Sequence, residues 1–317
     1  MSLPACLFLF FLCCILWNSE LSFHYAAQGL NLWFERMIPV LFPFMILSGI
    51  MVRMKYTEKI ALLIYPILRP YRIRKNVCYA IFMGFLCGFP MGAKVVAELY
   101  TEKCITKQEA DFLLAFCNNI GPVYFISFVL PLLGRRQVLP YLFGMYGIPL
   151  LYGFVLRYTC FRDLNGMCTT VSVNVAKRHL KHNKRKQSVS QLLLPILQAA
   201  DDSIHASIQS ILVLGGYMIL FNVLNIIPRL CCGEKYVLFA PLLEITGGLI
   251  SLGDKVPLYS LLALSLGGLS CLAQSYHCMR GTDLSISRYT LHKINITLLN
   301  GFYYLGWFWL FPLSFPK

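Results

Sequence analysis

The chain has 317 residues, of which 57% are hydrophobic and only 13% charged, and its mean hydropathy is +0.63. A soluble domain carries about 25% charged residues, so this composition excludes an ordinary soluble protein. The apolar residues gather in long runs, and several of these reach the roughly 17–25 residues that a membrane-spanning helix needs. We therefore expect an all-α polytopic membrane protein whose first partner is the lipid bilayer.

The net charge is +14, from 28 Lys and Arg against 14 Asp and Glu. A soluble basic face would indicate nucleic acid. Here the basic residues gather instead in two connections between apolar runs, at 53–75 and 157–186. Such clusters beside spans are the positive-inside signal, which places both connections in the cytoplasm. We expect no nucleic-acid partner.

The N-terminal segment, residues 1–26, contains the apolar run LPACLFLFFLCCILW at 3–17. It lacks the positively charged region that opens a secretory signal. We interpret it as a short transmembrane span that is retained, with cleavage as the alternative.

Residues 27–160 form the first membrane half, and the stretch GFLCGFPMGAKVVAELY at 84–100 is its most unusual part. Gly88 and Pro90 interrupt an apolar helix at membrane depth, and Gly92 follows. Pro90 lacks a donor and suits the first turn of a new helix, so a half-helix is expected near Met91. Its free N–H groups and positive dipole end would suit an anionic or acceptor-rich ligand. Lys94 lies one turn further on, with Glu98 as its partner at i+4.

A second broken segment follows at 113–134. Asn118 and Asn119 each bring an acceptor and two donors, and Gly121-Pro122 breaks the helix beside them. Amides at an unwound point bind a polar uncharged ring or sugar, or help to hold an ion. The alternative role is interhelical hydrogen bonding.

The longest polar stretch, residues 161–190, is predicted to be a basic cytoplasmic loop that separates the two halves. In the second half, residues 191–317, the run at 238–253 contains Glu244, Gly247 and Gly248. An ionisable residue at that depth is a functional candidate because a charge at the bilayer centre costs roughly 3 kcal/mol or more. The next run, 261–279, contains Gln274.

The two halves are weakly similar. Each has a glycine-rich cut followed by a cut that carries an amide, and Gly92 and Asn118 precede Gly248 and Gln274 by the same offset of 156 residues. With both basic connections in the cytoplasm and the first cut of each half re-entrant, the halves are related as inverted repeats. Many secondary transporters have this architecture.

A helix that stops in lipid leaves backbone groups unpaired, so such cuts are tolerated only around a cavity or inside protein. We therefore expect a polar cavity that takes an unknown small solute or ion. Simpler roles for single positions are helix kinks, close packing of small residues, and a surface location for Lys94 and Glu98. The candidate substrate-binding residues are Gly88, Pro90, Gly92, Lys94, Asn118, Asn119, Gly121, Pro122, Glu244, Gly247, Gly248 and Gln274.

The sequence GFPMGAK at 88–94, followed by FCNNIGPVYFI at 116–126, resembles the YlbJ-type sporulation integral membrane proteins, which have a gate or nucleoside-recognition domain. The similarity covers roughly residues 27–310 and is faint in the second half. It implies a bacterial cell-membrane protein needed for spore cortex formation, with sporulation membrane proteins as candidate partners. The domain label does not imply nucleoside transport.

Two functions are therefore in competition. The first is a permease or transporter, and the second is a non-transporting membrane scaffold that recruits cortex-forming partners through the loop 161–190. We expect no enzymatic activity, because the chain has no H-E-x-x-H, G-x-S-x-G or P-loop motif. The 13 cysteines form no C-x-x-C, and we expect no cofactor, metal site or structural disulfide.

Overall fold

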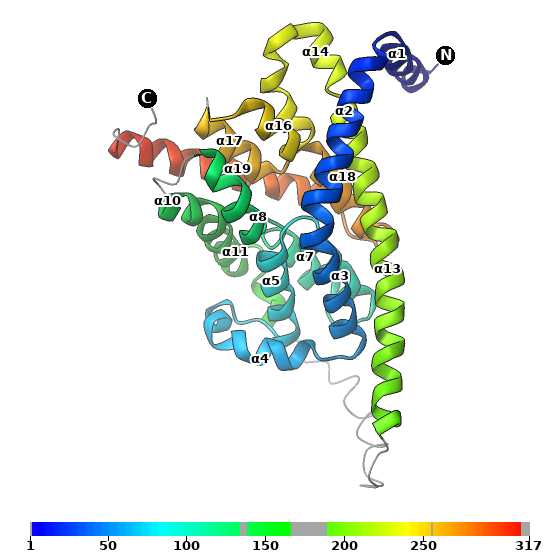
Figure 1. The fold of residues 1–317 in the computed structure, drawn as a ribbon. Coiled ribbons are helices and arrows are strands. Elements are labelled where there is room, and N and C mark those ends of the chain that lie inside the picture. The colour runs from blue at the N-terminus through cyan, green and yellow to red at the C-terminus, as the bar shows by residue number, and fades with distance from the viewer. Residues whose placement is uncertain (1, 134–137, 166–188, 255, 312–317) are drawn as a thin grey trace, which may run out of the picture.

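The computed structural model describes residues 2–133, 138–165, 189–254 and 256–311, and all regular structure within these ranges is helical. This confirms the all-α fold. The N-terminal apolar run forms α1 (Leu3–Trp17). The chain then continues as one helical rod, made of α2 (Ser19–Leu32), the π-helical turn η1 (Trp33–Met37) and α3 (Ile38–Arg53) (Figure 1).

The rest of the first half consists of shorter helices, several of which are interrupted at glycine or proline. In chain order they are α4 (Thr57–Leu68), η2 (Arg69–Tyr71), α5 (Lys75–Cys87), α6 (Met91–Thr101), α7 (Lys107–Leu114), α8 (Pro122–Tyr124), η3 (Phe125–Val129), α9 (Leu130–Leu133), α10 (Val138–Leu142), η5 (Phe143–Gly147), α11 (Ile148–Tyr158) and η6 (Arg162–Asn165).

The predicted loop 161–190 lies largely outside the described residues, which resume at 189. The second half again begins with a long helix and continues with broken segments. Its elements are α13 (Val189–Val223), α14 (Ile226–Cys232), η7 (Gly233–Leu238), α15 (Ala240–Leu243), α16 (Ile245–Leu252), α17 (Pro257–Leu266), α18 (Gly268–Met279) and α19 (Ile286–Leu310). The order of elements thus recurs, while the inverted relation between the halves stays a prediction.

The two long helical rods pack side by side and antiparallel (Figure 1). Small residues bring them close. A Cβ atom added to Gly29 would lie 2.9 Å from the Ile219 Cα, and one added to Gly49 would lie 2.9 Å from the Ser203 Oγ. Between these points the Trp33 indole donates to the Ile211 carbonyl at 2.9 Å. Close approach through small residues is how helices associate in lipid, where apolar side chains gain nothing by leaving the solvent.

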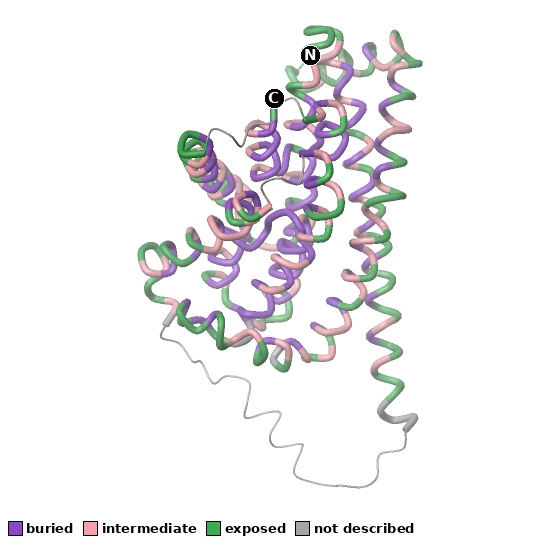
Figure 2. Tube along the Cα trace, turned by 60° about the vertical axis from the view of Figure 1, so that its left-hand side comes forward, coloured by how far each residue is buried: buried purple, intermediate pink, exposed green. Residues whose placement is uncertain are grey.

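Four helical stretches among the described residues are long and apolar enough to cross a membrane. They are Ser19–Arg53, Val138–Tyr158, Leu193–Leu238 and Pro257–Met279. Figure 2 shows buried residues in the middle of the bundle and exposed ones along the outer side of α13. Many exposed side chains are large and apolar, such as Leu212 and Phe302, as expected for surfaces that face lipid. This is a membrane protein.

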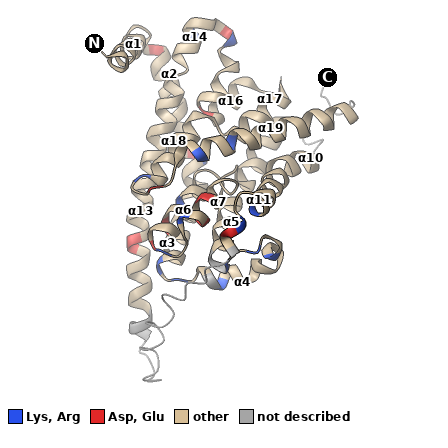
Figure 3. Ribbon diagram, turned by 180° about the vertical axis from the view of Figure 1, so that it is seen from behind, with Lys and Arg blue, Asp and Glu red and all other residues tan. Residues whose placement is uncertain are grey.

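Charged residues are sparse along the long helices and more frequent around α4 to α7 (Figure 3). The one fully buried arginine of this region, Arg157, donates to the carbonyls of Phe161 and Arg72 at 2.7 and 3.1 Å, which fixes the end of α11 to the turn before α5. The charge distribution therefore gives the bundle one end rich in charge and a body nearly free of it.

Candidate functional site

The first helix break separates α5 from α6. Gly88 has φ +79, a conformation that only glycine adopts without strain, and α6 begins at Met91 as the sequence predicts. Pro90 has no N–H to leave unpaired, and its carbonyl accepts from the Lys94 N–H at 3.0 Å. Gly88 and Pro90 therefore form the first break, as the sequence predicts.

The second break is the segment 115–121 between α7 and α8, which leaves the helix through a turn and crosses the first break in direct contact. A Cβ atom on Gly88 would lie 2.1 Å from the Gly121 nitrogen, and one on Gly121 would lie 2.7 Å from the Cys87 carbonyl. A Cβ on Gly92 would be 2.8 Å from the Cys117 carbonyl. These glycines are thus needed because two backbones touch. Pro122 starts α8 just beyond the crossing.

A lysine from the other end of the chain stabilises the second break. Lys293, in the middle of α19, is only 1% exposed. Its ammonium donates to the Asn118 carbonyl at 2.8 Å and to the Asn119 Oδ1 at 3.1 Å, and it lies 4.4 Å from the centre of the Phe89 ring. Within the described residues it has no carboxylate partner. The positive charge therefore binds to oxygen atoms that the unwound segment leaves free.

The two asparagines act mainly within the protein. The Asn118 amide donates to the Ser275 Oγ at 2.9 Å and to the Tyr289 hydroxyl at 2.8 Å, which ties the second break to α18 and α19. Its Oδ1 is buried without a partner among the described residues. The Asn119 amide donates to the Phe116 carbonyl at 2.6 Å. These contacts favour the interhelical role that the sequence left open.

The third break lies at Glu244, between α15 and α16. Its buried carboxylate caps α16, accepting from the Thr246 N–H at 3.0 Å and the Gly247 N–H at 2.7 Å, and from the Asn222 amide at 3.3 Å. Helix N-termini favour negative charge because their first N–H groups have no partner within the helix. No cationic side chain of the described residues pairs with this carboxylate.

The fourth break, at Gly267 with φ +89, separates α17 from α18 and touches the first and third breaks. A Cβ atom on Gly267 would lie 2.9 Å from the Phe89 ring, and one on Gly268 would lie 2.9 Å from the Pro241 carbonyl. Gly248 lies even closer to Pro241, with 2.2 Å from its ideal Cβ to the nitrogen. Here too, crossing backbones require glycine.

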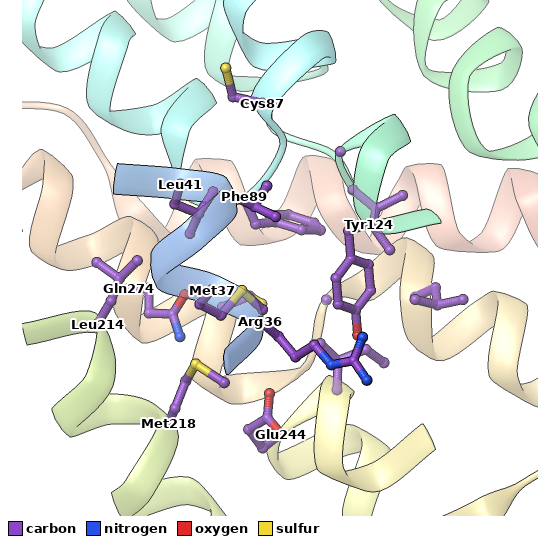
Figure 4. A pocket seen from close by; sticks show the side chains of 17 residues that line it. Arg36, Met37, Leu41, Cys87, Phe89, Tyr124, Leu214, Met218, Glu244 and Gln274 are labelled. Carbon is purple, nitrogen blue, oxygen red and sulfur yellow. The ribbon is translucent and has the colours of Figure 1, made fainter. Parts of the chain in front are cut away.

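Residues from all four breaks line one cavity of about 50 Å³, which we call the central cavity (Figure 4). The long rods close it on the other side. The volume leaves room for a few waters, far less than a drug-sized ligand needs. Its lining residues are Arg36, Met37, Val40, Leu41, Cys87, Phe89, Ile120, Gly121, Tyr124, Leu214, Met218, Glu244, Ile245, Leu264, Gly267, Cys271 and Gln274.

Three polar residues of the central cavity lie near one another on its wall, and Gln274 lies apart from them (Figure 4). Figure 4 shows the Arg36 side chain extending toward Tyr124, with Glu244 close below. Tyr124 donates to the Thr246 hydroxyl at 3.1 Å, so α8 is linked to the helix that Glu244 caps. Gln274, on α18, donates to the Ser270 Oγ at 3.0 Å and keeps its carbonyl oxygen as an acceptor. The remaining walls are apolar.

The predicted site residues divide into three groups. Gly121, Glu244 and Gln274 line the central cavity. Lys94 does not; it lies in a second cavity, with its Nζ 2.9 Å from the Ser210 Oγ and 4.0 Å from the Glu98 carboxylate. The others shape the breaks behind the wall of the central cavity, and they are Gly88, Pro90, Gly92, Asn118, Asn119, Pro122, Gly247 and Gly248.

Sequence reasoning missed Arg36, Phe89, Tyr124 and Lys293. A signal existed for Arg36, because it stands within an apolar stretch long enough to span the membrane, where charge marks a functional candidate. Lys293 lies in α19, which is not one of these stretches. The sequence contains no such signal for Phe89 and Tyr124, because aromatic residues are common in apolar segments. Their role depends on contacts between breaks that are distant in the sequence.

Comparison with known proteins agrees with the first half of this site. Residues 34–149 match the Gate family, described as nucleoside recognition, and this range contains the first and second breaks. The chain is 27% identical over 242 residues to the sporulation integral membrane protein YlbJ of Bacillus subtilis. That match covers 70% of this chain and 55% of the relative, so the chain spans about half the length of the curated protein it matches.

No solved structure matches this chain. Sequence comparison confirms the resemblance drawn from GFPMGAK and FCNNIGPVYFI: residues 34–149 are similar to the Gate family, and the chain is similar to a sporulation integral membrane protein.

Proposed function

We propose that this chain is a permease-like membrane protein that binds a small solute or ion at the central cavity. The observation that carries the proposal is that all four helix breaks contribute to one cavity wall. A scaffold needs no such arrangement, because unbroken helices satisfy their own backbone groups in lipid. Secondary transporters, in contrast, place their sites at discontinuous helices near the membrane midplane.

The chemistry of the wall narrows the kind of solute. Apolar side chains cover most of it, while Arg36, Tyr124 and Glu244 provide donors and acceptors in one region and Gln274 provides them in another. Pockets of this kind bury an apolar body and orient it through a few polar contacts. Because the cavity has room for only a few waters, the proposal is an ion held beside Glu244 or a very small solute with an apolar part and a hydrogen-bonding edge. A solute as large as a nucleoside would bind only if the breaks move apart. The proposal assigns no enzymatic reaction and no cofactor.

The cellular setting of the proposal comes from the relative in Bacillus subtilis, whose name places it in sporulation. We propose a place for this chain in the bacterial cell membrane, with the basic connections in the cytoplasm and a role in forming the spore cortex. Cortex-forming membrane proteins are the proposed partners. The positive-inside distribution of lysine and arginine supports this orientation.

A binding experiment tests the proposal directly. Purified protein in detergent is titrated with uridine, adenosine, N-acetylglucosamine and salts of Na⁺ and Mn²⁺, and the midpoint of thermal unfolding is followed. We expect at least one probe to stabilise the wild type and to lose its effect in Gln274→Leu and Arg36→Met. If none stabilises the protein, and proteoliposomes show no uptake of the same probes, the permease proposal is wrong.

A second experiment separates the permease from the scaffold. In a sporulating strain that depends on this chain, one variant carries Gln274→Leu and another carries a neutral linker in place of residues 166–188. The permease proposal predicts that cortex formation fails in the cavity variant and survives in the loop variant, with both proteins present in the membrane at normal amounts. The opposite result would establish the scaffold.

A further inference from the structure

A second cavity, of about 240 Å³, lies where α3 ends and is lined mainly by polar and charged side chains. We call it the polar cavity. Three residues of α6 contribute, Lys94, Glu98 and Thr101, whose spacing places them on one face of that half-helix. The remaining lining residues are Val52, Arg53, Ala97, Glu102, Ser210, His277, Cys278, Arg280 and Thr282.

The polar cavity is adjacent to the central cavity along two helices that line both. On α13, Ser210 belongs to the polar cavity and Leu214, one turn later, to the central one. On α18, Gln274 belongs to the central cavity and Cys278, again one turn later, to the polar one. One helical turn rises only about 5.4 Å, so a single layer of side chains separates the two spaces.

The charges of the polar cavity are incompletely paired. Lys94 is 7% exposed and its ammonium contacts the Ser210 hydroxyl, with the Glu98 Oε1 at 4.0 Å. The other carboxylate oxygen, Glu98 Oε2, is buried and has no hydrogen-bond partner among the described residues. A buried acceptor without a partner costs about 1–3 kcal/mol, so this oxygen calls for a donor from outside the chain.

Positive groups face the same space. Arg53 donates to the Ser203 Oγ at 3.0 Å and retains further N–H donors. The Arg280 guanidinium makes no hydrogen bond or ion pair with the residues that the structure describes, and it lies more than 4.0 Å from the carboxylates of Glu98 and Glu102. Among the described residues, Glu98 therefore has one carboxylate oxygen without a hydrogen bond, and the Arg280 guanidinium has unused N–H donors. Both line the same cavity and do not pair with each other.

From this arrangement we propose that the polar cavity is a second solute site, which binds a small zwitterion carrying an ammonium group and a carboxylate. The ammonium donates to the Glu98 Oε2, and the carboxylate accepts from Arg280. At the roughly 10–15 Å³ of cavity volume that one water needs, the polar cavity has room for well over ten waters, enough for a solute the size of a small amino acid.

Solutes with one charge fit less well. A simple cation would satisfy Glu98 but would lie among Lys94, Arg53 and Arg280. A simple anion would satisfy the bases but would leave the buried Glu98 oxygen without a donor and beside a like charge. Only a solute with both groups offers each side a charge-assisted hydrogen bond, which is about twice as strong as a neutral one.

The place of this site on a solute path rests on the permease function proposed above, whereas its binding chemistry does not. If solute moves between the two cavities, the zwitterion site is the vestibule at the end where α3 terminates. Binding at Glu98 and Arg280 is measurable on its own. A failure of transport through the central cavity and a failure of binding at the polar cavity thus give different results.

The experiment uses ω-amino acids of increasing length, from glycine through β-alanine and 4-aminobutyrate to 6-aminohexanoate, with full-length protein in detergent. Affinity is obtained from the concentration dependence of thermal unfolding and checked by calorimetry. We expect one length to bind best. Propionate and n-propylamine, which each carry a single charge, are expected to bind roughly 10- to 100-fold more weakly.

Two substitutions locate the probe. Glu98→Gln is expected to weaken the best ω-amino acid by about tenfold or more without weakening propionate, and Arg280→Gln to weaken it similarly without weakening n-propylamine. Arg280 is exposed, so its substitution leaves folding intact even if Glu98→Gln does not. Asp201→Asn and Arg69→Gln change exposed charges outside the cavity and serve as controls.

Three results would overturn the proposal. These are the absence of any effect of the ω-amino acids on the wild type, equal affinity for the singly charged probes, or undiminished binding in Arg280→Gln. Gln274→Leu, in the central cavity, provides the remaining comparison. It is expected to abolish uptake into proteoliposomes but to leave ω-amino acid binding in place, which separates this site from the function proposed for the central cavity.

Discussion

The two pairs of helix breaks solve the same physical problem with opposite charges. In the first pair, the unwound segment 115–121 leaves oxygen atoms free, and the ammonium of Lys293 donates to two of them. In the second pair, the start of α16 leaves N–H groups free, and the carboxylate of Glu244 accepts from two of them. The sign of the buried charge follows the polarity of the groups at each cut, which are a backbone carbonyl and a side-chain amide oxygen in the first pair and backbone N–H groups in the second.

The two pairs of breaks also differ in where their stabilising charge comes from in the sequence. Glu244 caps the helix that follows it, so its partners at Thr246 and Gly247 are neighbours in the sequence. Lys293, on α19, donates to the segment between α7 and α8, which is far from it in the sequence. The first pair of breaks therefore depends on the C-terminal helix, whereas the second is held mainly from within. Both pairs share one feature, the glycine crossings at Gly88 and Gly248.

The largest expected effect follows from removing the anion. Glu244→Leu leaves two backbone N–H groups and the Asn222 amide without their acceptor in a buried place, and we expect a loss of about 3–5 kcal/mol in the free energy of unfolding. Titration with SDS in mixed micelles measures it. Glu234→Leu, on an exposed side chain, is the control and is expected to cost less than about 1 kcal/mol. If both variants lost the same free energy of unfolding, Glu244 would not stabilise the protein by capping α16.

The glycine crossing is the next test. A methyl group on Gly88 would lie 2.1 Å from the Gly121 nitrogen and at positive φ, so Gly88→Ala is expected to cost about 3 kcal/mol. Gly216 is a helical glycine with nothing within 4 Å of its ideal Cβ, and Gly216→Ala is expected to be neutral or to stabilise by up to about 1 kcal/mol. Unfolding of both variants in the same micelles gives the comparison.

Removing the cation is expected to have a smaller effect. Lys293→Met leaves the Asn118 carbonyl and the Asn119 Oδ1 without a donor, at a cost of about 2–3 kcal/mol, partly offset because a charge no longer has to be buried. Lys235→Met, at an exposed position, is the matched control. If Lys293→Met unfolds at the same SDS concentration as the wild type, the claim that Lys293 stabilises the first pair of breaks is wrong.

The positions of the helix breaks could be predicted from the sequence, but the residues that contact each break could not. Gly88, Pro90 and the Gly121-Pro122 pair interrupt a helix through their own backbone chemistry, whatever surrounds them. The i+4 spacing of Lys94 and Glu98 likewise predicted their neighbourhood, which the 4.0 Å distance confirms. Which cavity Lys94 enters depends on how α6 packs against α13, and Lys293 lies 174 residues from Asn119. No local pattern contains such information.

Another buried carboxylate, that of Glu109, caps a helix outside the membrane spans and can be compared with Glu244. Glu109 completes a capping box with Thr106 at the start of α7 and, unlike Glu244, has a cationic partner, since Arg74 donates to both its oxygens. Burial alone would raise the pKa of this carboxyl, but the hydrogen bonds from Arg74 and Thr106 outweigh it, so the pKa of Glu109 lies below its ordinary value.

The sign of this shift gives the smallest predicted effect. A carboxyl with a lowered pKa in the folded state stabilises the fold above its unfolded pKa of about 4.3, and that contribution is lost as the pH falls toward the folded pKa. Glu109→Gln preserves the capping geometry and removes the charge, so we expect a loss of about 1 kcal/mol at neutral pH and a smaller difference from wild type in acid. Glu20→Gln, on an exposed part of α2, is the control. A difference that stayed constant with pH would mean that Glu109 acts through geometry alone, as an uncharged cap does, and that its pairing with Arg74 adds nothing.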